Sequence, residues 1–220
     1  MDFFGDAWLL SRVTFLIPVV LSLSVHEWAH AWCAFQLGDD TAARAGRLTL
    51  NPLEHLDPVG LLLPLLGVPF GWARPVPVDP GRMRGASLRA GIVLVAAAGP
   101  LANLLLALGA TLVMGLWARL DPSAAASSGA GWKLLELLAL VNLLLALFNV
   151  IPVPPLDGSR ILDGLCPAWL RPHWEAFSRV GPAALVVLLL VPALLGMSVV
   201  AGPVAELQRF LDVVYELVAG

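Results

Sequence analysis

The sequence predicts an all-α membrane protein, a polytopic bundle of about four to five transmembrane helices. Composition is the first reason: 59% of the 220 residues are hydrophobic and only 13% are charged. A soluble domain carries about 25% charged residues. The second reason is that several apolar stretches are long enough to cross a bilayer. The only two cysteines, Cys33 and Cys166, indicate separately that the chain has no disulfide framework.

Four apolar stretches have the length of a membrane span. About 20 apolar residues in a helix cross the hydrocarbon core of roughly 30 Å. The four stretches are Trp8–Leu37, Leu88–Trp117, Leu134–Ile151 and Pro182–Val200.

A fifth apolar stretch, Val59–Gly71, is too short for an ordinary span and contains Pro64 and Pro69. Such a length is typical of a re-entrant, hairpin-like or interfacial segment. A linker rich in small residues, Ser123–Gly131, is expected between two of the spans.

The C-terminus has the pattern of an amphipathic helix. Between Pro203 and Val218, apolar residues recur every three to four positions and charged residues fill the other face. We expect this helix to lie on the membrane surface or on the bundle. The sequence therefore divides into a bundle over residues 1–202, with its core at about 20–160, and the amphipathic helix over 203–220.

The distribution of arginines predicts the orientation in the membrane. Six arginines lie between Gly38 and Arg89, and three lie between Gly158 and Gly181. If Val59–Gly71 re-enters, both groups fall on one side, which the positive-inside rule makes the cytoplasm. If that segment spans, the N-terminal part of the topology is inverted. We favour the re-entrant topology because it keeps all six arginines together.

The net charge of −3 without a basic tract argues against nucleic acid as a partner.

One motif within the first apolar stretch carries chemistry. His26, Glu27 and His30 form an H-E-x-x-H pattern. Residues four apart share a helix face, so both imidazoles can bind one metal ion, and Glu27 can take a proton from a metal-bound water. The pattern is typical of zinc metallopeptidases. Ionisable groups at membrane depth are costly and indicate function.

A third metal ligand is expected from elsewhere in the chain, since catalytic zinc usually has three protein ligands and a water. Asp157 is the best acidic candidate because it follows a kinked segment with three prolines directly after an apolar stretch. The alternative is that Asp157 only caps a helix at the membrane surface. His55 is expected to bond the backbone, and Cys33 to be a small buried residue.

These motifs resemble those of the site-2 protease family, the intramembrane zinc metalloproteases of peptidase family M50. Besides H-E-x-x-H, the family has an N-x-x-P-x-P-x-L-D-G motif and a G-P-x-x-N element. The matching residues here are Asn149, Pro152, Pro154, Leu156, Asp157 and Gly158, and Gly99, Pro100 and Asn103. The match covers about residues 20 to 160 and is similar to a compact bacterial branch without PDZ or CBS domains.

The resemblance implies one Zn²⁺ per chain, bound by His26, His30 and Asp157, with Glu27 as the catalytic base. It also implies that Asn149 lies near the scissile peptide, although Asn149 could instead bond the kinked backbone beside it. If zinc binds there, the Asp157 carboxylate should lie within about 5 Å of both imidazoles. Asn103 is expected to bond other helices or backbone rather than substrate.

The predicted function is hydrolysis of peptide bonds in membrane-spanning protein substrates, by a multi-pass protein of the bacterial inner membrane. The alternative is a membrane zinc-binding or zinc-transport protein without protease activity. A transporter would need more acidic ligands along several helices, and the long apolar stretches have almost none outside the motifs. A catalytically silent scaffold would have no need of Glu27.

Overall fold

A computed structural model describes residues 6–66, 71–123, 129–194 and 201–220, and most of these residues are helical. Within these ranges, the one pairing of extended backbone is an isolated antiparallel bridge between Leu56 and Ala73. The longer helices are α1 (Asp6–Gln36), α5 (Leu88–Leu120), α7 (Ala130–Val150), α9 (Arg171–Leu194) and α10 (Ala201–Ala219). The shorter ones are α2 (Thr41–Arg44), α3 (Pro52–His55), α4 (Pro58–Leu65) and α8 (Asp157–Leu165), with a 3-10 turn at Pro80–Arg82.

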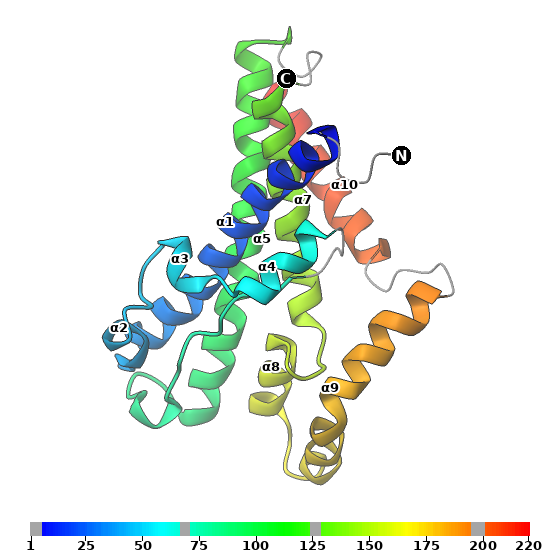
Figure 1. Cartoon of the computed structure of the whole chain (residues 1–220). Coiled ribbons are helices and arrows are strands. Elements are labelled where there is room, and N and C mark those ends of the chain that lie inside the picture. The colour runs from blue at the N-terminus through cyan, green and yellow to red at the C-terminus, as the bar shows by residue number, and fades with distance from the viewer. Residues whose placement is uncertain (1–5, 67–70, 124–128, 195–200) are drawn as a thin grey trace.

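Helices α1, α5 and α7 pack against one another and form the centre of the bundle (Figure 1). Two of the four predicted spans are confirmed as helices long and apolar enough to cross a membrane, namely α5 and α7. Large apolar side chains point outward along α5, among them Leu101, Leu105 and Leu116, each more than half exposed. Such a surface is costly in water and suits contact with lipid.

The chain between α1 and α5 leaves and returns at the same end of the bundle. The carbonyl oxygen of Leu37 accepts hydrogen bonds from the amides of Arg84 at 2.8 Å and Gly85 at 3.1 Å. The segment between them therefore makes no net crossing. Within it, α4 has only eight residues, and the bridge from Leu56 to Ala73 closes a hairpin-like turn around it. This arrangement favours the re-entrant topology, although residues 67–70 of the predicted segment lie outside the described residues.

The two helices that follow α7 lie to one side of the bundle. Helix α8 packs on α5. The first turn of α9 is tied to α8, because the Trp174 indole donates to Asp163 at 3.2 Å and Arg171 lies 3.6 Å from the same carboxylate. Beyond that turn, α9 diverges from the central helices (Figure 1). The predicted span Pro182–Val200 stays a prediction, since residues 195–200 lie outside the described part, as do residues 124–128 of the predicted linker.

Helix α10 was expected to lie either on the membrane surface or on the bundle. It packs against α5 and α7 and therefore lies on the bundle. Val204 and Leu211 of its apolar face are buried. The helices approach closely at Gly115, where a Cβ would lie 2.9 Å from Cβ of Val218. A glycine is therefore needed at this crossing.

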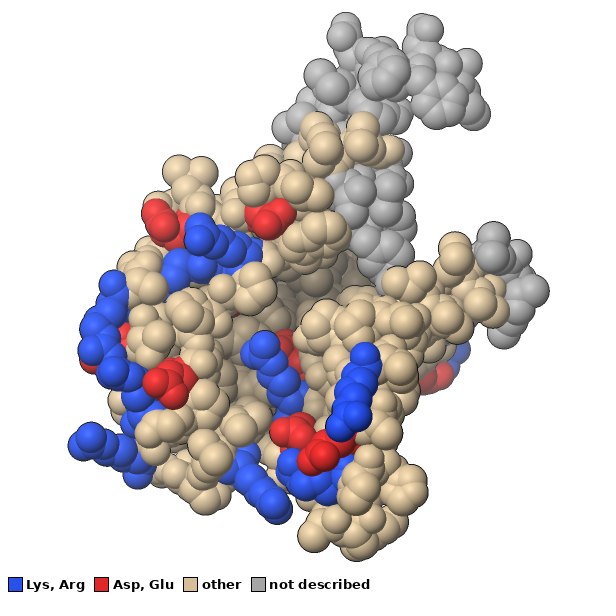
Figure 2. All heavy atoms as spheres, turned by 60° about the horizontal axis from the view of Figure 1, so that its bottom comes forward, with Lys and Arg blue, Asp and Glu red and all other residues tan. Residues whose placement is uncertain are grey.

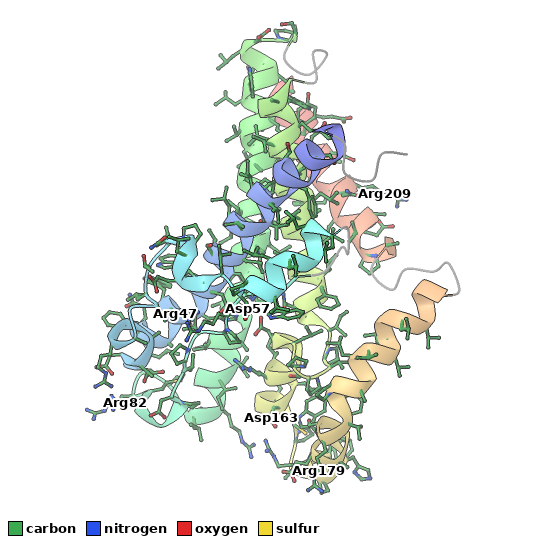
Figure 3. All side chains as sticks on the ribbon, in the orientation of Figure 1. Arg47, Asp57, Arg82, Asp163, Arg179 and Arg209 are labelled. Atoms are coloured by element: carbon green, nitrogen blue, oxygen red, sulfur yellow. The ribbon has the colours of Figure 1, made fainter. Side chains whose placement is uncertain are left out.

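Both arginine-rich segments lie at the same end of the molecule. Figure 3 shows Arg82, from the segment before α5, and Arg179, from α9, at that end, with Arg209 of α10 far from it. Figure 2, which turns that end forward, shows basic side chains around it and a hollow between the α1–α5 side and the α9 side.

Candidate metal centre

The two histidines of the H-E-x-x-H motif project from one face of α1 toward a common point. Their Nε2 atoms lie 3.0 Å apart. Both side chains are buried, His26 at 5% and His30 at 7% exposure. This convergence follows from helical geometry, since residues four apart lie above one another on the same face.

Asp157 reaches the same point from the first turn of α8. Its Oδ2 lies 3.1 Å from Nε2 of His26 and 3.2 Å from Nε2 of His30, within the separation expected from the sequence. Prolines prevent a continuous helix between the end of α7 and Asp157. Gly158 allows the tight return, because a Cβ there would lie 2.1 Å from the carbonyl oxygen of Val150.

Helix α5 forms the wall behind both imidazoles. Nδ1 of His30 lies 2.7 Å from the carbonyl oxygen of Val95, and Nδ1 of His26 lies 2.5 Å from Oδ1 of Asn103. Between these two contacts stands Gly99, where a Cβ would lie 2.4 Å from Nε2 of His30 and 2.6 Å from Cε1 of His26. The imidazoles occupy the space that any larger side chain would need.

Glu27 is held by an extended segment, Trp72–Val78, that lies over the site. The amide of Val76 donates to Oε2 of Glu27 at 3.0 Å. Nearby, the Arg74 amide donates to the His55 carbonyl at 2.8 Å, and the Arg47 guanidinium donates to the Arg74 carbonyl. Arg47 is 6% exposed, and burial lowers the pKa of its guanidinium. These bonds fix the covering segment, and with it one oxygen of the Glu27 carboxylate.

The site opens into a cavity of about 120 Å³. Its polar lining comes from His26, Glu27, His30, Asn149, Asp157 and Arg160, and its apolar lining from Pro75, Val76, Val78 and Pro155. Arg160 also lines two neighbouring cavities, of about 460 Å³ beside α9 and about 250 Å³ under the covering segment. Arg160 therefore borders both the site and two further cavities.

Asn149 lines this cavity, and its side chain also bonds the backbone. Its Nδ2 donates to the carbonyl oxygen of Leu145 at 3.0 Å. An amide nitrogen carries two hydrogens, so one donor remains for another partner.

The cluster fits a zinc ion. Two imidazole nitrogens and one carboxylate oxygen, all within 4.8 Å of one another, match the ligand types and number of a catalytic zinc. The Asp157 side chain is buried at 7% exposure and offers one carboxylate oxygen to the cluster, so it can act as an anionic ligand.

The other candidate ligands lie elsewhere. The ring of His55 is fully buried and bonds the carbonyl oxygen of Thr49 at 2.7 Å, as expected. Cys33 packs beside the apolar cluster of Ala34, Met83 and Val95. Among the described residues, no other group of three or more His, Cys, Asp or Glu side chains converges in this way.

The sequence analysis missed several groups that surround the site. Asn103 bonds helices as expected, but its contact with His26 was not foreseen, and neither was its bond to Asn142 at 2.6 Å. Asn142 is a polar residue within a predicted span, which is itself a signal of function. No signal identified the Val95 carbonyl, since a backbone atom has no sequence signature.

Comparison with known proteins adds independent support. A sequence model described as Peptidase family M50 matches residues 113–192, which include Asn149 and Asp157. A Bacillus subtilis (strain 168) protein named "Putative zinc metalloprotease YwhC" is 42% identical over 186 residues, covering 83% of each chain. The chain belongs to peptidase family M50. This M50 member is a zinc metalloprotease, and Zn²⁺ is its cofactor.

Two mycobacterial relatives, both named "Putative zinc metalloprotease Rip2", are more distant. The one from Mycolicibacterium smegmatis is 33% identical over 205 residues, which cover 84% of this M50 chain and 71% of the relative. The one from Mycobacterium tuberculosis H37Rv is 33% identical over 188 residues, which cover 80% and 66%. No solved structure matches this chain.

Gly99→Ala should weaken zinc binding. The new Cβ would occupy the space of the imidazole rings, so we expect the affinity for zinc to fall at least about tenfold, the scale seen when support for metal ligands is lost. Competition with a chromogenic chelator measures the effect. Gly109→Ala is the matched control on the same helix, because a Cβ there meets nothing within 4 Å. Equal zinc affinities of the two variants would contradict the conclusion that the imidazoles leave no room for a side chain at position 99.

Proposed function

We propose that this chain is an intramembrane zinc endopeptidase that hydrolyses peptide bonds of membrane-spanning protein substrates. One observation carries the proposal: Nε2 of His26, Nε2 of His30 and Oδ2 of Asp157 converge beside Glu27 at a cavity. These three side chains would be the zinc ligands. Two nitrogens and one oxygen leave a fourth position open, which is the arrangement of catalytic rather than structural zinc sites.

Glu27 is the proposed general base. When bound, zinc supplies a Lewis acid that polarises the attacking water and the scissile carbonyl. The Val76 amide holds one oxygen of the Glu27 carboxylate, which leaves the other to accept a proton from the water. Glu27 then passes that proton to the leaving nitrogen, so the same group acts first as base and then as acid.

Asn149 is proposed to stabilise the oxygen of the scissile carbonyl as it gains negative charge. It lines the same cavity as Glu27. Its bond to the Leu145 carbonyl fixes the amide group, and the second N–H remains to donate to substrate. A donor fixed before the reaction stabilises developing charge better than one that must reorient.

The location of the site supports a substrate within the membrane. Gly99, which faces the imidazoles, lies 11 residues after the start of α5, or about 16 Å along that helix at 1.5 Å per residue. Peptide bonds at such depth are normally hydrogen-bonded within a helix, so a substrate must unwind locally before it is cleaved. Arg160 lines both the site cavity and the cavity beside α9, and water would enter from the basic end through these cavities.

We infer that this end faces the cytoplasm, with the protein crossing the bacterial inner membrane several times. The two arginine-rich segments lie together there (Figure 3), as the positive-inside rule requires for cytoplasmic loops. Both termini of the described chain then lie toward the other side (Figure 1). The alternative function, zinc transport, gains no support, because the described residues hold a single cluster of this kind and a transport path needs several.

Glu27→Gln should lower kcat by about 10²- to 10⁴-fold, the usual contribution of a general base. Zinc should remain bound, because Glu27 is not one of the three converging ligands. Asp157→Ala should lose both activity and zinc. Cleavage of a membrane-spanning substrate and metal content should be measured on the same samples. Full activity of Glu27→Gln would refute the assigned role.

The proposed orientation predicts which exposed positions react with reagents outside the cell. In a variant without Cys33 and Cys166, a cysteine at Arg84 should be protected from a membrane-impermeant maleimide in intact cells. A cysteine at Ser123, at the opposite end of α5, should be labelled; both positions are exposed. Labelling only at position 84 would reverse the orientation while leaving the zinc chemistry intact.

A further inference from the structure

We propose that Asn103 is a positioning residue that holds His26 in the tautomer protonated at Nδ1. The lone pair of Nε2 is then directed at the metal. This inference rests on the proposed function, because it takes His26 as a zinc ligand. It adds a group that does not touch the metal but determines whether His26 can bind it. The argument depends on which atom of the Asn103 amide faces the imidazole.

Two backbone carbonyls determine that orientation, because a carbonyl can only accept hydrogen bonds. The carbonyl oxygen of Ser22 lies 3.3 Å from Nδ2 of Asn103, so the nitrogen must be on that side. The carbonyl oxygen of Leu138 lies 2.7 Å from Nδ2 of Asn142, so the oxygen of Asn142 faces Asn103. Nδ2 of Asn103 donates to that oxygen at 2.6 Å. Both bonds place Oδ1 of Asn103 toward His26.

Oδ1 of Asn103 is an acceptor and lies 2.5 Å from Nδ1 of His26. Nδ1 must therefore carry the proton, and in the neutral ring Nε2 has the lone pair. His30 is held in the same tautomer by the Val95 carbonyl, 2.7 Å from its Nδ1. The two Nε2 atoms and the Asp157 carboxylate then present lone pairs to one another at 3.0 to 3.2 Å. A cation between them relieves the resulting repulsion.

The polar cluster is closed off from solvent. Ser22, Asn103 and Asn142 are each 0% exposed, and Nδ2 of Asn142 also donates to Oγ of Ser22 at 2.7 Å. The three residues come from α1, α5 and α7, which are the helices at the centre of the bundle. An unpaired amide in such surroundings is costly, so the amide of Asn103 cannot flip without breaking bonds to two other helices. Packing of these helices thereby sets the tautomer of His26.

Nuclear magnetic resonance on the full-length, zinc-loaded protein in detergent micelles tests the tautomer directly. The chain has only four histidines, and His26→Ala identifies the signal of His26. With ¹⁵N-labelled histidine, we expect a proton on Nδ1 of His26 and the shift of a metal-bound nitrogen for Nε2. A proton on Nε2 with metal-bound Nδ1 would overturn the proposal, and this test needs no substitution at Asn103.

Asn103→Leu tests the consequence for zinc, because leucine has a similar size and no acceptor for Nδ1. We expect zinc affinity, measured by chelator competition, to fall about 10- to 100-fold, as is usual when the group orienting a metal ligand is lost. The visible spectrum of the Co²⁺-substituted protein should change as well. Asn103→Asp keeps an acceptor and should recover part of the affinity. Thr111→Val is the matched control, since Thr111 is a buried polar residue of α5 that bonds only the Ala107 carbonyl.

The outcomes separate this inference from the proposed function. If His26→Ala abolishes zinc binding while Asn103→Leu and Thr111→Val both bind zinc as the wild type does, the role of Asn103 is refuted and the ligand set stands. If Thr111→Val loses as much affinity as Asn103→Leu, the effect is general loss of packing, which also refutes the role. If His26→Ala binds zinc as tightly as the wild type, the ligand set itself fails.

Discussion

Three side chains, His26, His30 and Asp157, direct their ligand atoms at one point inside the helix bundle, and the surrounding structure is arranged to permit this. Two of the ligand atoms come from one face of α1, while the third must come from a different part of the chain. The carboxylate reaches them only because α7 ends at Val150 and the chain turns tightly past Gly158. On the opposite side, α5 can approach the imidazoles only because Gly99 has no side chain.

The same site combines chemistry that needs water with a bundle that suits lipid. Polar groups inside an apolar bundle require partners, and here each has one: the Val95 carbonyl for His30, Asn103 for His26 and the Val76 amide for Glu27. The covering segment and Arg160 both border the cavity at this site. The reacting groups are thereby buried among the helices and still face a space that water can occupy.

Much of the site could be predicted from the sequence because its signals are local. Helical spacing alone brings His26 and His30 together, and the long apolar runs of α5 and α7 identify two spans. Asp157 was found only through its proline-rich motif, since spacing along the chain says nothing about a contact between residues 131 apart. The bond between His26 and Asn103 spans 77 residues and depends on helix packing, which the sequence pattern does not specify.

Other features stayed open for different physical reasons. An amphipathic pattern shows that α10 has one apolar face, but lipid and protein can cover such a face equally well; only the contacts with α5 and α7 place it on the bundle. Similarly, the contact between the Val76 amide and Glu27 involves the backbone, so no residue type could reveal it.

Zinc K-edge X-ray absorption of the purified full-length protein in detergent micelles tests the central claim most directly. The account predicts one zinc per chain with a first shell of nitrogen and oxygen only, at about 2.0–2.2 Å, and scattering from two imidazole rings. A sulfur ligand at about 2.3 Å would place a cysteine on the metal, and a single imidazole would remove His26 or His30. Either result would contradict the assignment of His26, His30 and Asp157 as the ligand set.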